Sequence, residues 1–426
     1  MVENMSLDLS TPAAQRLHAP GKKRILTIDG GGVRGIVALA FLKELESQLR
    51  AATGRSSLVL ADVFDLVAGT SVGSMLATMV SLGLPVNQME LHFRDMAPKI
   101  FAGRPTIFGQ KRFSPEPLAE AVRKIAGDAT LGSPKLLTGL AIIAKRVDTG
   151  AVWVMINNPA TPYYEDGTDE FGAAFIGNKR YTLETLIRAS TAAPFLFTPA
   201  AIEVHPHGAG RPSTGWFVDG GVSPHNNPAL QMLLMAALPA YRLNWTLSPD
   251  DLMMISIGTG MHRARIDPKK KALDGSLIGS MLTKHLREDI EEAAFAASTL
   301  RSMVADSVLF SLQVMQSVAN PRFSWKINGE IGDLHNELLL QALKGLPGGH
   351  HDPRGLLTFQ RYDLPLDDSG LVPPEYDVVA AQAERSALHA IDDATIIDPL
   401  SRLASEAARK QVSLHEFEGF LSQVAR

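Results

Sequence analysis

The chain of 426 residues contains no cysteine. This absence excludes disulfides, a thiolate zinc site and a cysteine nucleophile, so covalent catalysis would have to use another side chain. No apolar run approaches the roughly 20 residues that a membrane-spanning helix needs. Residues 1–6 have neither a basic start nor an apolar core, so they predict no secretory signal. We therefore expect a soluble, cytoplasmic protein, for which peripheral contact with the inner membrane face stays compatible.

The sequence also lacks an excess of positive charge. The formal net charge is -4, from 41 lysines and arginines against 45 aspartates and glutamates. This balance argues against a nucleic-acid-binding surface over the whole chain, though not against a local basic patch. The composition, with 45% apolar and 20% charged residues, is typical of a globular protein with a sizeable core.

No group of side chains has the spacing of a metal site. His205 and His207 lie in a glycine- and proline-rich segment with no third ligand nearby, so we expect them to be exposed loop histidines. The pair His350-His351 has no obvious partners either. We expect neither a metal nor a cofactor.

The first strand signal is followed by a run of glycines. Residues 24–29 read as a strand, Gly30-Gly31-Gly32-Val33-Arg34-Gly35 follows, and a helix is expected over 36–50. Such a turn can cradle a phosphate, or its amides can form an oxyanion hole for acyl transfer. The phosphate alternative is the weaker one. No Gly-Lys-[Ser/Thr] ending follows, and no acidic residue for a ribose stands about 20 residues further on.

A second turn carries a serine. An apolar strand over 65–70 runs into Gly69-Thr70-Ser71-Val72-Gly73, and a helix is expected through 75–80. A serine on a tight strand-to-helix turn is held in a strained conformation with its hydroxyl exposed, and the flanking glycines leave room for the backbone. This order of elements predicts a nucleophile at Ser71.

A third strand, over 216–218, ends at Asp219-Gly220-Gly221. Strand ends of an open parallel sheet converge on one crevice, so the three motifs should meet there. Asp219 is the candidate base for Ser71, because no histidine lies in a comparable position. An aspartate in water has a pKa near 3.9 and is a weak base, so we expect Asp219 to be largely buried. The candidate oxyanion donors are the backbone amides of Gly30, Gly31 and Gly32.

The rest of the chain suggests how it is divided. We expect a flexible arm over 1–22, an α/β domain over 23–262, and a mostly helical extension over 263–426 packed on the core. Residues 98–115 combine four basic side chains with apolar ones and contain no acidic residue. They form either a flap that meets anionic headgroups or an ordinary surface loop, and the lack of helical amphipathicity favours the loop.

Three motifs in order carry a resemblance to a known family. They are Asp29-Gly30-Gly31-Gly32-Val33-Arg34-Gly35, Gly69-Thr70-Ser71-Val72-Gly73 and Asp219-Gly220-Gly221, with supporting matches at 189–194, 226–228 and 256–260. Over residues 25–260 the sequence resembles a patatin-like phospholipase. The resemblance implies a three-layer α/β/α fold with a mostly parallel sheet and lipid acyl hydrolysis. It implies Ser71 as nucleophile, Asp219 as base and the glycine-loop amides as oxyanion hole. Arg34 would lie near that loop, fixing it or meeting an anionic headgroup.

The sequence therefore predicts a serine acyl hydrolase that releases fatty acids from glycerophospholipids. Hydrolysis of neutral glycerides or small esters stays open. So does a ligand-activated phospholipase, because Phe359-Gln360-Arg361-Tyr362 and the late helical region are similar to some cyclic-nucleotide-activated antiphage phospholipases. A non-enzymatic alternative is a sensor that binds a nucleotide phosphate at 30–35. The expected partner is a phospholipid or membrane surface and not a nucleic acid. A small-molecule activator and the oligomeric state are left open.

Overall fold

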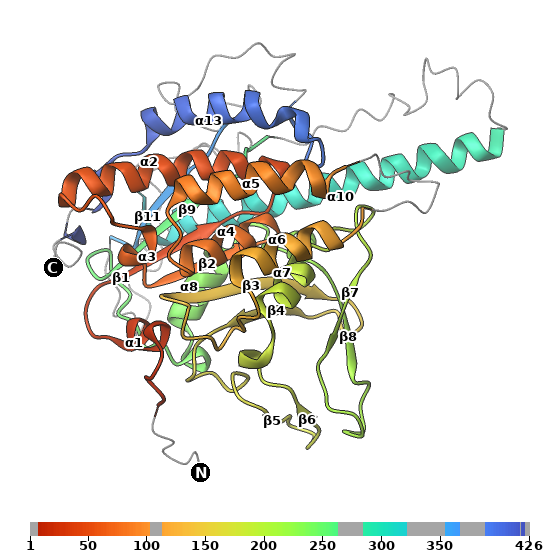
Figure 1. The fold of residues 1–426 in the computed structure, drawn as a ribbon, viewed down its shortest axis with the longest axis horizontal. Helices are drawn as coiled ribbons and strands as arrows, with labels where there is room; N and C mark the ends of the chain where they lie inside the picture. The colour runs from red at the N-terminus through yellow and green to blue at the C-terminus, as the bar shows by residue number, and fades with distance from the viewer. Residues whose placement is uncertain are drawn as a thin grey trace, which may run out of the picture.

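A computed structural model describes residues 7–102, 113–262, 284–321, 354–366, 388–417 and 419–421 (Figure 1). Its centre is a nine-stranded sheet with the order β10-β11-β9-β1-β2-β3-β8-β7, in which β4 also pairs with β3. The strands of this sheet are β1 (Lys23–Ile28), β2 (Leu66–Thr70), β3 (Gly139–Arg146), β4 (Val152–Ile156), β7 (Ala200–Glu203), β8 (Thr214–Asp219), β9 (Leu252–Ile257), β10 (Asn320–Pro321) and β11 (Thr358–Tyr362). A separate small hairpin joins β5 (Gly167–Thr168) to β6 (Ala174–Phe175).

The sheet is mixed but mostly parallel. From β10 to β3 every neighbouring pair is parallel. Strands β4, β8 and β7 are added through antiparallel pairs. The carboxyl ends of β1, β2 and β9 therefore meet at one edge, which is where the predicted motifs begin. The expected α/β fold with a mostly parallel sheet is confirmed.

Helices cover both faces of the sheet, which explains why its central strands read as continuous apolar runs. In β9, Met253 and Ile255 belong to one apolar cluster, while Leu252 and Met254 belong to the other. The first cluster includes residues of α2 (Gly35–Thr53), α4 (Val72–Ser81), α5 (Val86–Ile100), α6 (Glu116–Ala126), α7 (Leu183–Ser190) and α13 (Ile397–Gln411). The second includes residues of α1 (Pro12–His18), α8 (Ala229–Ala237) and α10 (Lys284–Val318). The layers are thus helix, sheet and helix.

Part of the expected flexible arm is ordered. Residues 12–18 form α1, whose first turn is capped by the Thr11 hydroxyl accepting the Ala14 N–H. Leu17 is fully buried, and its carbonyl accepts a hydrogen bond from the Trp245 indole at 2.9 Å. The expectation of an unstructured segment is wrong here, because Ala13, Ala14 and Leu17 of this short helix are buried and Leu17 belongs to the second apolar cluster.

The C-terminal part extends the sheet as well as adding helices. Strand β11, over 358–362, is the parallel neighbour of β9. Helix α13 lies along α2 in Figure 1, and several of its residues belong to the same apolar cluster. The expected division at residue 262 therefore does not follow the edge of the sheet.

Several expectations fall outside the described residues. They concern residues 103–112 of the basic segment 98–115 and the His350-His351 pair. The start of that segment, 98–100, is the last turn of α5. Within the described ranges, no helix has both the length and the apolar character required to cross a membrane.

Candidate active site

Ser71 lies on the turn between β2 and α4, as predicted. Its backbone is strained, with φ 55° and ψ -130°. The flanking glycines are required by close contacts. A Cβ on Gly69 would lie 2.1 Å from the Gly73 carbonyl oxygen, and one on Gly73 would lie 2.2 Å from the Ile28 carbonyl oxygen. Both distances are far below a van der Waals contact. The turn that carries Ser71 can therefore close and pack against β1 only with glycine at these two positions.

Asp219, the last residue of β8, contacts the predicted nucleophile. The Ser71 hydroxyl donates a hydrogen bond to Asp219 Oδ2 at 2.6 Å, and the Gly221 N–H donates to Oδ1 at 2.7 Å. The predicted burial of Asp219 is confirmed, since the residue is 5% exposed. Burial raises the pKa of Asp219 to about 6, against the opposing effect of the hydrogen bonds from Ser71 and Gly221. Within the described chain, no histidine donates to this carboxylate.

Ser190 holds the backbone of the nucleophile, a role that the sequence did not reveal. Its hydroxyl accepts the Ser71 N–H at 2.9 Å and donates to the Ile143 carbonyl at 2.6 Å. The residue is fully buried at the end of α7. The supporting motif 189–194 marked this segment, but a contact between residues 119 apart in the chain leaves no local pattern.

The glycine loop after β1 has fewer free amides than expected. The Gly30 N–H donates to the Asn226 carbonyl at 3.1 Å, and the Val33 N–H donates to the Ile391 carbonyl at 2.9 Å. The expectation that Gly30 supplies an oxyanion donor is wrong, because its amide is already bonded. The N–H groups of Gly31 and Gly32 have no acceptor in the described part of the chain. They remain the candidate oxyanion donors.

A buried cluster of charged side chains holds Asp29, the residue that directly precedes this loop. Both Asp29 carboxylate oxygens are bound by the Arg361 guanidinium, at 3.0 Å and 2.7 Å, and Arg361 also binds Asp363 at 2.6 Å. Burial opposes the charge on Arg361, but its two carboxylate partners outweigh burial and raise its pKa. Burial likewise raises the pKa of Asp29, and Arg361 opposes that effect. The two-pronged geometry favours the ionised pair.

Arg34 lies inside the protein. It is 9% exposed, its Nη1 lies 3.2 Å from His262 Nδ1, and the His262 ring stacks on His389 at 4.3 Å between centroids. Burial lowers the pKa of Arg34 to about 10. Of the two expected roles, this position fits fixing the loop. The remaining motif glycines are close-approach positions, where an added Cβ would lie 2.8 Å or less from another atom: Gly35, Gly220 and Gly221.

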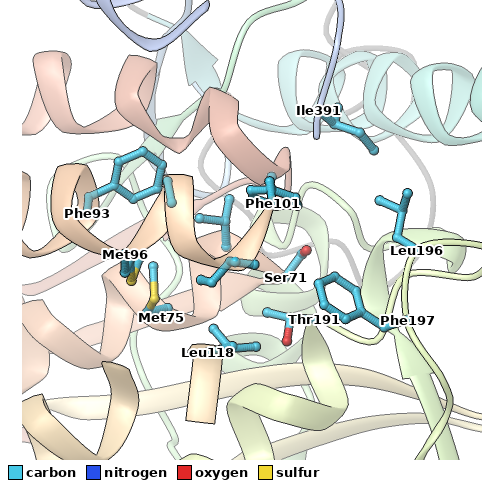
Figure 2. A pocket seen from close by; sticks show the side chains of 14 residues that line it. Ser71, Met75, Phe93, Met96, Phe101, Leu118, Thr191, Leu196, Phe197 and Ile391 are labelled. Atoms are coloured by element: carbon cyan, nitrogen blue, oxygen red, sulfur yellow. The ribbon is translucent and has the colours of Figure 1, made fainter. Parts of the chain in front are cut away.

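An apolar pocket opens beside Ser71 (Figure 2). Met75, Met96 and Phe93 lie to one side of the serine, and Phe197 and Leu196 lie to the other. Ile391, which belongs to the C-terminal part of the chain, lies above the serine in this view. The full lining is Gly32, Ser71, Val72, Met75, Phe93, Met96, Ala97, Ile100, Phe101, Leu118, Thr191, Leu196, Phe197 and Ile391. Such a lining matches a hydrocarbon chain whose polar end meets Ser71.

The two loop histidines take no part in this site. The expectation that His205 is exposed is wrong. The residue is only 9% exposed, and its Nδ1 donates to the Ala174 carbonyl at 2.8 Å. His207 is exposed and lies 3.8 Å from Glu203. Among the residues with described positions, no group of three or more histidines and carboxylates is placed to hold a metal ion.

Comparison with known proteins matches the N-terminal half of the chain. Residues 26–233 fit the family model described as patatin-like phospholipase. Patatin-15 from Solanum tuberosum is 27% identical over 251 residues, which cover 56% of this chain and 60% of the relative. Patatin-B1 from the same plant is 28% identical over the same shares. The chain thus spans about three fifths of the length of these curated relatives.

A likeness to a solved structure covers more of the chain but is weak. The crystal structure of VipD from Legionella pneumophila aligns with 90% of this chain and 67% of that chain. The TM-score is 0.35 and the sequence identity 10%, and at that score the likeness adds nothing to the assignment.

Proposed function

Because the chain belongs to the patatin-like phospholipase family, a family of serine acyl hydrolases, we propose that it releases fatty acids from glycerophospholipids, with Ser71 as nucleophile and Asp219 as base. One observation carries this proposal: the 2.6 Å hydrogen bond from Ser71 Oγ to Asp219, beside an apolar pocket. A hydroxyl bonded to a carboxylate with raised pKa is arranged for proton transfer.

In the acylation step, Ser71 Oγ attacks the ester carbonyl carbon while its proton passes to Asp219 Oδ2. Burial supports this transfer, because an aspartate with a pKa of about 6 is a stronger base than one in water. The Gly221 N–H holds the other carboxylate oxygen, so that Oδ2 stays turned toward the serine.

The tetrahedral intermediate carries its negative charge on the former carbonyl oxygen. The amides of Gly31 and Gly32 are the donors assigned to it, and one such donor is typically worth a factor of about 100–1000 in rate. Collapse expels the lysolipid alkoxide, which takes the proton from Asp219. Water then attacks the acyl-serine with Asp219 again as base, and releases the fatty acid and the free serine.

The pocket lining favours a long acyl chain over a small ester. Apart from Ser71, Thr191 is its one lining side chain with a hydroxyl or charge in the described structure. Neutral glycerides carry the same acyl chains, so the lining alone does not separate them from phospholipids. The nucleotide alternative has less support, because the amides of Gly30 and Val33 are already bonded and the loop presents fewer donors to a phosphate.

Fatty-acid release from phospholipid and triglyceride dispersions tests the proposal. We expect wild type to act on phospholipid, and Ser71→Ala and Asp219→Asn each to lose activity by at least about a thousandfold. Ser56→Ala, which removes an exposed serine, is the matched control and should retain full activity. Full activity in Ser71→Ala or Asp219→Asn would refute the dyad. Preference for triglyceride would refute the substrate class.

A further inference from the structure

A short segment links the base to the pocket wall. The Asp219 N–H donates to the Ala192 carbonyl at 3.0 Å, and Leu196 and Phe197, a few residues later, line the pocket beside Ser71 (Figure 2). The N–H groups of Leu196 and Phe197 both donate to the Ala193 carbonyl, which closes a tight turn. Phe195 lies on this turn directly before the pocket residue Leu196, and it is 53% exposed.

Neither packing nor backbone conformation accounts for phenylalanine at this position. Its φ is 67°, a left-handed conformation that is unfavourable for a residue with a Cβ. Glycine or asparagine would adopt it more readily. The exposed ring regains little of that cost through burial. An exposed aromatic side chain on a strained turn beside a candidate active site points to function outside the fold itself.

The surroundings of Phe195 favour one kind of partner. The Arg188 guanidinium lies over the Phe197 ring at 5.8 Å from its centroid, and it donates to the Thr198 carbonyl at 2.6 Å. A cation therefore contacts the pocket residue Phe197, and an exposed aromatic ring directly precedes the pocket residue Leu196 in the chain. This combination matches a phospholipid layer, which presents phosphates at its surface and hydrocarbon beneath.

We propose that Phe195 inserts into a phospholipid surface and holds the rim of the pocket against it. A lipid can then pass from the layer into the pocket without its acyl chain crossing water. The inference rests on the proposed function, because the same surface supplies the substrate. It adds the residue through which the protein engages that surface.

The first test compares two substrates presented differently. Phe195→Asn removes the ring and keeps a residue that tolerates the left-handed backbone. Hydrolysis is measured on vesicles of equal parts phosphatidylcholine and phosphatidylglycerol, and on a monomeric short-chain ester. We expect the ratio of vesicle to ester hydrolysis to fall about tenfold, equivalent to about 1.4 kcal/mol. The control Phe171→Asn changes a phenylalanine that is 76% exposed between β5 and β6, and should leave the ratio unchanged.

An unchanged ratio of vesicle to ester hydrolysis in Phe195→Asn would overturn the inference. If both rates fell equally, the ring would be assigned to the pocket instead. Vesicle binding is measured separately by cosedimentation in the Ser71→Ala background, which needs no turnover. We expect Ser71→Ala to bind these vesicles and Ser71→Ala with Phe195→Asn to bind about tenfold more weakly. Equal binding by the two would contradict the inference even if the proposed hydrolysis failed.

Discussion

Asp29, which follows β1, and Asp219, the last residue of β8, are both buried, yet their hydrogen-bond partners differ. Asp29 is bound on both oxygens by Arg361, which stabilises its charge and ties the glycine loop to β11. Asp219 accepts hydrogen bonds only from Ser71 and the Gly221 N–H within the described structure, and no cation contributes to its pKa shift. The first arrangement stabilises structure. The second leaves a carboxylate that readily accepts a proton, as a general base requires.

The burial of Asp219 without a cationic partner predicts a gain in stability when this residue is replaced. Burial raises the pKa of Asp219 from 3.8 to about 6, so between these values the folded state keeps a proton that the unfolded state has released. The free energy of unfolding therefore falls as pH rises through this window. Asp219→Asn removes that loss, and should raise the free energy of unfolding at pH 7 by up to about 3 kcal/mol while abolishing activity.

Urea unfolding at neutral pH and below about pH 4 measures the effect, which should vanish at the lower pH. Asp148→Asn is the control of opposite sign. Although burial opposes it, the hydrogen bonds from Arg146 and the Trp216 N–H hold the pKa of Asp148 below its ordinary value. Its replacement should lower stability at neutral pH. A loss of stability at pH 7 in Asp219→Asn would contradict the assigned environment of the base.

Ser190 should matter more for rate than for folding. Ser190→Ala deletes the hydroxyl that accepts the Ser71 N–H, so we expect kcat on a soluble ester to fall about 10–100-fold and stability to fall by about 1–3 kcal/mol. Ser81→Ala removes an equally buried hydroxyl, which donates to the Thr138 carbonyl at 3.3 Å, and should leave kcat unchanged. Equal kcat losses in the two variants would show that burial, and not the contact with Ser71, explains the effect.

At the scale of elements, the glycine loop depends on a segment from the other end of the chain. Gly32 has φ 58°, and a Cβ there would lie 2.0 Å from the Ile391 carbonyl oxygen. Gly54, the residue after α2, has φ 68° and no atom within 4 Å of an added Cβ. Replacing either glycine by alanine strains the backbone, but only Gly32→Ala must displace the segment around Ile391.

Thermal and urea unfolding of the two alanine variants separates the cost of backbone strain from the cost of the steric clash with Ile391. We expect Gly32→Ala to lower the free energy of unfolding by about 2 kcal/mol more than Gly54→Ala, because a clash with backbone adds to the conformational cost. Hydrogen exchange at the Val33 amide, which donates to Ile391, should also become faster in Gly32→Ala. Equal stability losses would mean that the segment gives way without cost.

At the scale of the whole molecule, the C-terminal part completes the fold. A fragment ending at residue 262 would lose β11, α13 and Arg361, which leaves the edge of β9 unpaired and Asp29 buried without its cation. Removing one partner of a buried ion pair typically costs about 3–5 kcal/mol. We expect the fragment to aggregate or to unfold without a cooperative transition, and to recover solubility when residues 263–426 are expressed with it. A soluble, cooperatively unfolding fragment would contradict this prediction.

The parts of the site that could be predicted from the sequence are those marked by a local pattern of adjacent residues. Ser71 and Asp219 follow apolar strands and are flanked by glycines, so their places at strand ends were readable. Arg361 binds Asp29 from 332 residues away, and Ile391 reaches the glycine loop through a backbone carbonyl that no side-chain pattern marks. These partners are set by tertiary packing. The same reason explains why α1, a helix of seven residues, was not expected.

The central claim is that Ser71 is a nucleophile activated by Asp219. Its most direct test is the rate at which a fluorophosphonate labels the protein, with the modified peptide identified by mass spectrometry. We predict one adduct, on Ser71, that forms faster as pH rises through about 6 and is absent in Ser71→Ala and at least about a hundredfold slower in Asp219→Asn. Labelling of another serine, or an unchanged rate in Asp219→Asn, would contradict it.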